Sequence, residues 1–164
     1  MKAHALGFVT LAALGIVLLG CSGGPDRDDS GQIVEEGDLG VFDFKVGDCF
    51  QDPENLSTGS AGVADVAAVP CTVLHDNEVF ALFDVSGRFD SWPGTPELET
   101  VADEVCFDAF EPYVGLDFES SRLSFVWLLP SQETWEENDD REVVCILYDV
   151  ELAKLTGSMR NSGE

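Results

Sequence analysis

The positions of the five cysteines constrain this chain more than any other feature of its sequence. Cys21 stands alone at the end of an uncharged segment, and the other four are Cys49, Cys71, Cys106 and Cys145. An even set of cysteines in a short exported domain predicts a disulfide framework, whereas the same set in a cytosolic protein suggests metal binding or catalysis. The compartment in which the chain folds therefore decides the chemistry of these four thiols.

The first 20 residues have the pattern of a secretory signal peptide. Lys2 supplies a positive start, and the 16 residues of 5–20, ALGFVTLAALGIVLLG, carry no charge. This segment is shorter than the roughly 20 residues that a helix needs to cross a bilayer. A basic start, a short apolar segment and small residues at its end are typical of an export signal.

The end of this segment, Leu-Leu-Gly-Cys at 18–21, resembles the bacterial lipobox. The resemblance implies cleavage after Gly20 and a lipidated Cys21 that carries fatty-acyl chains such as palmitate. Two or more acyl chains hold a protein stably at a membrane, whereas a single chain holds it only marginally. The alternatives are an ordinary signal peptide in which Cys21 has no special role, or a short uncleaved anchor. The lipoprotein interpretation accounts for the odd thiol and predicts a lipid anchor on the extracytoplasmic face of the cell membrane.

The chain after the leader is strongly acidic. Removal of residues 1–20 takes Lys2 away, which changes the formal net charge from −24 to −25 and leaves 144 of the 164 residues. This excess argues against binding to nucleic acid and against lying flat on an anionic bilayer. Residues 21–41 are rich in Gly, Ser, Asp and Glu, a composition that predicts a flexible acidic tether. We expect one folded domain at 42–160 and a short tail at 161–164.

The hydrophobic pattern of this domain predicts short strands linked by turn-rich segments. In the strand predicted at 77–85, the odd-numbered residues from Val79 to Val85 should share one face. A single turn of helix, capped by Ser131, is predicted between the last two long strands. The predicted strands are 46–50, 63–71, 77–85, 122–130 and 141–150, with a short one in the final segment.

One long amphipathic helix is predicted between these strands. Thr95 suits the N-cap and Pro96 the first helical position, while apolar residues recur at helical spacing through the following segment. Pro112 and Gly115 are expected to end the helix. The sequence therefore predicts an α+β fold, in which an antiparallel sheet carries one main amphipathic helix and two disulfides.

Four cysteines allow three pairings, and the sequence alone does not choose among them. No pair has C-x-x-C spacing, which argues against a thiol redox carrier, and a four-thiolate zinc site usually contains closely spaced pairs. Local pairing is the simplest arrangement, and a bridge from Cys106 in the helix to Cys145 in a strand would join helix to sheet. We therefore predict the bridges Cys49–Cys71 and Cys106–Cys145, and neither a metal nor a cofactor.

His75 is the only histidine after the leader, because His4 leaves with the signal. Together with Asp76 and Glu78 it offers the residue types of a partial metal or acid–base cluster. In an extended strand, however, His75 and Glu78 would point to opposite faces of the sheet. The favoured interpretation is that His75 forms a hydrogen bond near Cys71 and orders that corner of the chain.

Two tryptophans, Trp92 and Trp135, lie in predicted loops. An aromatic side chain in a loop can anchor a partner protein or a sugar, although it more often closes the edge of a core. We assign no catalytic residue. The candidate ligand-binding residues are His75, Glu78, Trp92 and Trp135.

Several short motifs together resemble one family. They are G-D-C at 47–49, P-C-x-x-x-H-x-x-E-V at 70–79, LPSQETWEENDDREVVCILYD at 129–149 and LTGSMR at 155–160. This set is similar to the septum formation domain of actinobacterial membrane proteins and lipoproteins, over roughly residues 45–160. The resemblance implies a cell-envelope domain with a link to cell division and no established catalytic chemistry. The acidic stretch at 136–142 is longer than the family pattern.

We therefore expect a lipid-anchored binding or interaction domain of the cell envelope, whose partner is an envelope or division protein. The alternative is an envelope enzyme that uses His75 with a neighbouring carboxylate. An open cleft around His75 would favour the enzyme, whereas an exposed patch around Trp92 or Trp135 with His75 buried would favour the binding domain.

Overall fold

The computed structural model describes residues 24–52 and 63–164. The signal segment predicted at 1–20 and the acylation site predicted at Cys21 lie outside the described residues. None of the helices in the described part of the chain has the length and hydropathy of a membrane span.

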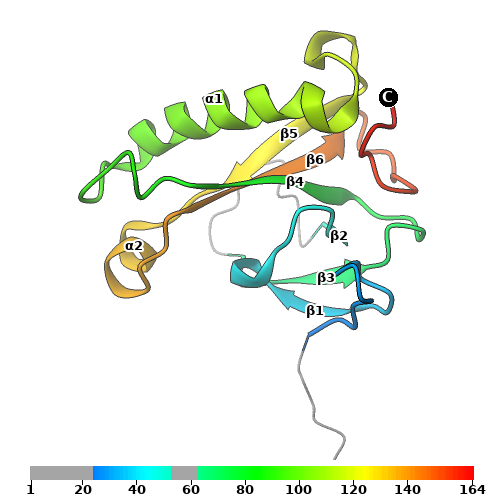
Figure 1. Ribbon diagram of the computed structural model, residues 1–164, viewed down its shortest axis with the longest axis horizontal. Helices are drawn as coiled ribbons and strands as arrows, with labels where there is room; N and C mark the ends of the chain where they lie inside the picture. Colours follow the sequence, from blue (N-terminus) through cyan, green and yellow to red (C-terminus); the bar gives the residue numbers. More distant parts are fainter. Residues whose placement is uncertain (1–23, 53–62) are drawn as a thin grey trace, which may run out of the picture.

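Six strands form one antiparallel sheet in the order β1-β3-β2-β4-β6-β5 (Figure 1). The two eight-residue strands, β4 and β6, lie at its centre, and the two-residue β2 joins them to the β1–β3 pair. The α+β prediction is confirmed. The strands are β1 (Gly37–Gly40), β2 (Cys49–Phe50), β3 (Asp65–Val69), β4 (Asn77–Asp84), β5 (Leu123–Leu128) and β6 (Glu142–Asp149).

The long helix α1 (Thr95–Val114) lies across one face of this sheet (Figure 1). Its N-cap is Gly94, at a φ of 97°, so the prediction of Thr95 as N-cap is wrong by one residue. Glycine occupies this position because its left-handed φ is strained for any residue with a Cβ. Gly115 ends the helix as predicted, in the left-handed C-cap conformation, while Pro112 lies inside the last turn.

The short helix α2 (Gln132–Glu137) forms where a single turn was expected. The Ser131 hydroxyl accepts from the Thr134 backbone N–H at 3.0 Å, and the Thr134 hydroxyl accepts from the Ser131 N–H at 2.9 Å. This reciprocal capping box confirms the Ser131 cap. Two single-turn 3-10 helices, η1 (Val41–Asp43) and η3 (Phe118–Ser120), complete the described elements.

Both faces of the sheet bury apolar side chains. Residues of α1 cover one face, and Ile33, Leu39 and Phe44 from the N-terminal segment pack on the other. A register shift in β4 between Val79 and Ala81 interrupts the alternation of side chains. Val79 therefore belongs to the core opposite α1, although the regular alternation predicted it on the same face as Ala81.

The two disulfides join the predicted pairs. Cys49–Cys71 ties β2 to the turn after β3, with Cα atoms 5.2 Å apart. Cys106–Cys145 joins the middle of α1 to the middle of β6, with Cα atoms 5.6 Å apart. Both distances suit unstrained bridges. The helix is thus bonded covalently to the centre of the sheet.

The acidic segment predicted as a flexible tether is packed on the domain from residue 24 onward. Residues 37–40 form β1, and Ile33 and Leu39 are buried. Arg27 forms a two-pronged ion pair with the buried carboxylate of Asp48, at 2.5 and 2.7 Å. The prediction of a flexible tether from overall composition is therefore wrong for residues 24–41. Two buried apolar side chains and one ion pair are enough to attach this segment to the domain.

The final segment also differs from its prediction. Leu155 makes an isolated two-way bridge with His75 rather than a strand. The tail is attached to the end of α1, because the Asn161 N–H donates to the Tyr113 carbonyl at 2.7 Å and the Gly163 N–H to the Val114 carbonyl at 2.9 Å. These bonds satisfy carbonyl groups that a helix end leaves without partners.

The substitution Arg27→Ala should lower the free energy of unfolding by about 1.5–3 kcal/mol, because Asp48 would stay buried without its charged partner. Urea denaturation measures the loss. Arg88→Ala is the matched control, since Arg88 forms a long, exposed pair with Glu104 at 3.6 Å that should contribute about 0–1 kcal/mol. Equal losses in the two variants would contradict the assigned role of Arg27.

Candidate functional site

The candidate residues of the H-x-x-E motif lie at the beginning of β4. His75 precedes the strand, and its backbone exchanges two hydrogen bonds with Leu155, at 3.1 and 2.8 Å. Glu78 is the second residue of β4 and is fully buried. Because β4 lies between β2 and β6, Glu78 is in an inner strand of the sheet rather than in an edge strand.

The carboxylate of Glu78 accepts three hydrogen bonds from distant parts of the chain. The Tyr113 hydroxyl of α1 donates at 2.6 Å and the Ser158 hydroxyl at 2.5 Å, both to Oε1. The Met159 backbone N–H donates to Oε2 at 2.6 Å. A buried carboxylate is stable only when its oxygens are satisfied in this way. Glu78 therefore holds α1 and the C-terminal segment against β4.

The pKa of the Tyr113 hydroxyl is shifted by its buried position beside Glu78. Burial, followed by the negative charge of Glu78, raises the pKa of its hydroxyl above the ordinary value of about 10. The guanidinium of Arg160 lies 4.5 Å above the Tyr113 ring, within range of a cation–π contact. The hydroxyl therefore stays protonated and continues to donate to Glu78.

His75 is fully buried and faces its own turn. Its Nδ1 lies 2.7 Å from the Val73 carbonyl, so Nδ1 carries the proton and donates. Its Nε2 is also buried and has no hydrogen-bond partner among the described residues. The bond to Val73 orders the turn two residues after Cys71, which agrees with the interpretation that the sequence favours.

Asp76 does not join His75 and Glu78 in a cluster. Its carboxylate accepts from the Lys154 ammonium and from the Asp52 backbone N–H, both at 2.7 Å, at the surface of the domain. The side chains of His75, Asp76 and Glu78 thus share no hydrogen-bond partner and do not bond to one another. The geometry does not assemble the imidazole–carboxylate pair that acid–base chemistry requires.

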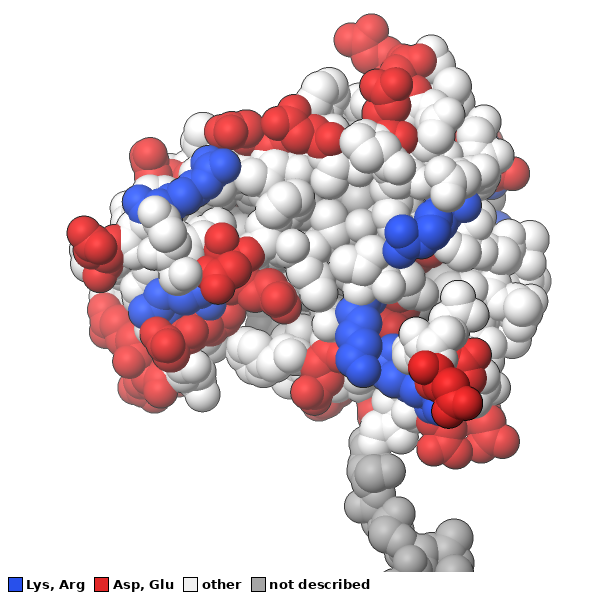
Figure 2. Space-filling view, in the orientation of Figure 1, with Lys and Arg blue, Asp and Glu red and all other residues white. Residues whose placement is uncertain are grey.

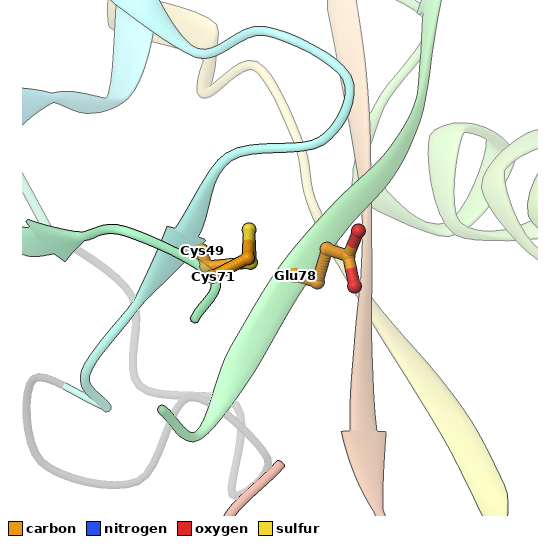
Figure 3. A group of neighbouring side chains, drawn as sticks. All are labelled: Cys49, Cys71 and Glu78. Atoms are coloured by element: carbon orange, nitrogen blue, oxygen red, sulfur yellow. A yellow bond between two sulfur atoms is a disulfide. The ribbon is translucent and has the colours of Figure 1, made fainter. Parts of the chain in front are cut away.

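One group of potential metal ligands is present among the described residues. The sulfurs of Cys49 and Cys71 and a carboxylate oxygen of Glu78 lie within 4.8 Å of one another. Figure 3 shows Glu78 extending from β4 beside the two cysteines. The two sulfurs are bonded to each other, however, and metals bind the free thiolate. In the oxidised protein this donor set does not fit a metal ion.

The two candidate tryptophans pack against each other. Their ring centroids are 5.6 Å apart in an edge-to-face arrangement. Trp135 lies on α2 and is 4% exposed, and the guanidinium of Arg141 covers its ring at 3.8 Å. Trp92 is half-buried and packs against the core beneath α1. Both rings therefore close the edge of the core in this structure, and the exposed aromatic surface lies elsewhere.

Tyr113, Ser158 and Met159 are the partners of Glu78 that the sequence did not identify. They lie 35, 80 and 81 residues away from it along the chain. No local pattern connects such positions. The only signal is that the segment LTGSMR at 155–160 accompanies the H-x-x-E motif among the motifs of the family resemblance.

The substitution Glu78→Gln should lower the free energy of unfolding by about 1–3 kcal/mol, because an amide cannot accept all three hydrogen bonds of the carboxylate. Hydrogen exchange at the Met159 amide should accelerate with it, since that N–H loses its acceptor. Glu137→Gln on exposed α2 is the control and should change stability by no more than about 0.5 kcal/mol. If both variants unfold at the same urea concentration, Glu78 does not hold the C-terminal segment.

Tyr113 should make the protein less stable as the pH rises above about 10. In the unfolded chain Tyr113 loses its proton near pH 10, whereas in the folded protein its raised pKa keeps the proton bound. The unfolded state then binds fewer protons, so the free energy of unfolding falls with rising pH. Urea midpoints between pH 8 and about 11 measure this slope. Tyr113→Phe should flatten it and Tyr148→Phe should not; the same slope in both variants would refute the assignment.

The region that a family model matches contains the whole set of interactions around Glu78. A family model described as septum formation matches residues 46–163, which include β2 through the C-terminal segment and every partner of Glu78. No curated protein and no solved structure matches the chain significantly. Membership suggests a link to septum formation and a place in the cell envelope. The motifs, the disulfide-bonded fold and the model match show that the chain belongs to the septum formation family.

Proposed function

We propose that this protein is a lipid-anchored binding domain on the extracytoplasmic face of the cell envelope, where it acts through a partner protein in septum formation. The observation that carries the proposal is the family match over residues 46–163. The export signal expected at 1–20 and the lipobox at Cys21 support the anchor and the location.

The chemistry of the fold supports a binding role. Both disulfides are of the kind that persists outside the cytoplasm. His75 and Glu78 are closed to solvent and engaged in holding the fold together. No observation on the described residues favours the alternative of an envelope enzyme based on His75.

Cross-linking in cells tests the proposal. The full-length protein and a Cys21→Ser variant are expressed in a bacterium that processes lipoproteins, and their cross-linked partners are identified by mass spectrometry. The native protein should begin at Cys21, carry acyl mass, sediment with membranes and cross-link to proteins of the division site. The Cys21→Ser variant cannot be acylated, so it should carry no acyl mass and should lose the cross-links that depend on the lipid anchor.

The two parts of the proposal fail separately. An unprocessed N-terminus without acyl mass would refute the lipid anchor. Cross-links to envelope proteins in general, without enrichment of division proteins over an unrelated lipoprotein, would refute the septal role.

A further inference from the structure

A groove runs along the last turns of α1 and the single-turn helix η3. Its volume is about 630 Å³. Two aromatic side chains, Phe107 and Phe118, form its apolar part, and four carboxylates line it. These are Asp108, Glu111, Asp117 and Glu119. The groove lies on the opposite side of α1 from the buried Cys106. None of the candidate residues His75, Glu78, Trp92 and Trp135 lines it.

Phe107 is unusually open for its residue type, with 53% of its surface exposed. Its ring packs edge-on against Phe118 at 5.7 Å, and Phe118 packs against the buried Phe110 at 5.0 Å. Phe118 also contacts Phe125 of β5, at 5.4 Å. The aromatic row therefore continues from the groove into the core. The exposed ring is held in a fixed position without being buried.

The electrostatic character of the groove is uniformly negative. None of the ion pairs among the described residues involves its four carboxylates. The last turn of α1 contains no basic residue, and the C-terminus of a helix adds partial negative charge. Arg160, a cation at this helix end, is stacked on Tyr113. Figure 2 shows acidic side chains over α1 and the loop that follows it.

A cationic group is therefore attracted to the groove, and the exposed ring adds a cation–π surface. A hard metal ion would gain little from the ring, and the carboxylates surround an open groove rather than converge on a point. A peptide that carries Arg or Lys beside apolar residues matches both properties, because its cations complement the carboxylates and its apolar side chains cover the aromatic row.

We propose that this groove binds a basic, partly apolar segment of a partner protein, with an arginine or lysine over Phe107 and an apolar side chain against Phe118. This inference rests on the proposed function as a binding domain and names the surface and the partner chemistry that it requires.

Fluorescence anisotropy with a defined probe tests the groove. The protein is residues 21–164 with Cys21→Ser, which removes the predicted acylation site, and the probe is a labelled ten-residue peptide of alternating Arg and Leu. The same peptide with Glu in place of Arg is the reference and should not bind. Phe107→Ala should weaken binding of the Arg/Leu peptide by about tenfold or more, and Glu111→Gln by about threefold, with a smaller dependence on salt.

Two exposed residues away from the groove provide matched controls. Phe42→Ala removes an aromatic ring that is 63% exposed on η1, and Glu137→Gln removes a carboxylate on α2. Both should change the affinity by less than about twofold. Urea midpoints of all four variants verify folding, and amide shifts of the ¹⁵N-labelled chain should cluster at residues 107–119 when the Arg/Leu peptide is added.

Four results would overturn the groove assignment. These are no binding of the Arg/Leu peptide, equal weakening by the Phe107 and Phe42 variants, shifts spread over the acidic surface, or the same shifts with Ca²⁺ or spermine alone. Septal cross-links that persist in membrane-anchored Phe107→Ala protein would also overturn it, while leaving the proposed function intact. Their loss in that variant, but not in Phe42→Ala, would support it.

Discussion

The carboxylate of Glu78 lies at the centre of the sheet with no exposure to solvent, and the arrangement of the C-terminal half follows from how its oxygens are satisfied. Water cannot reach it, so protein groups must donate to it. Tyr113 brings the end of α1 to this point, and Ser158 and Met159 bring the last segment. One buried charge thus specifies the mutual position of a strand, a helix and a segment without regular structure.

The Cys106–Cys145 bridge and the Glu78 interactions hold α1 at two places. The disulfide fixes its middle to β6, and Tyr113 fixes its last turn to β4. The end of the helix is further closed by amides of the tail, including that of Asn161. The outer surface of α1 and η3, on the other side of the helix, carries carboxylates that take part in none of the ion pairs of the described residues, together with the exposed Phe107.

Three of the four residues that the sequence singled out as candidates for ligand binding are buried in the folded protein. His75, Glu78 and Trp135 are all buried, and each has a contact that orders a turn, a helix or an edge of the core. A polar residue within an apolar stretch carries the same signal whether it serves a reaction or a buried network. Only the number of donors and acceptors around it in space distinguishes the two roles.

The sequence by itself determined the class of the fold, the Ser131 cap and the Gly115 stop, because each depends on nearby residues or on hydrophobic period. It left three cysteine pairings open, and the structure joins the two pairs that were predicted as the simplest arrangement. The tertiary structure decided the partners of Glu78, the bulge that turns Val79 away from α1, and the packing of residues 24–40 through Arg27 and Asp48. These depend on groups from 21 to 81 positions apart or on sheet register. Local composition does not predict such contacts. The free energy of burying a charge or an apolar side chain depends on the groups that surround it in the folded chain, and these come from distant parts of the sequence.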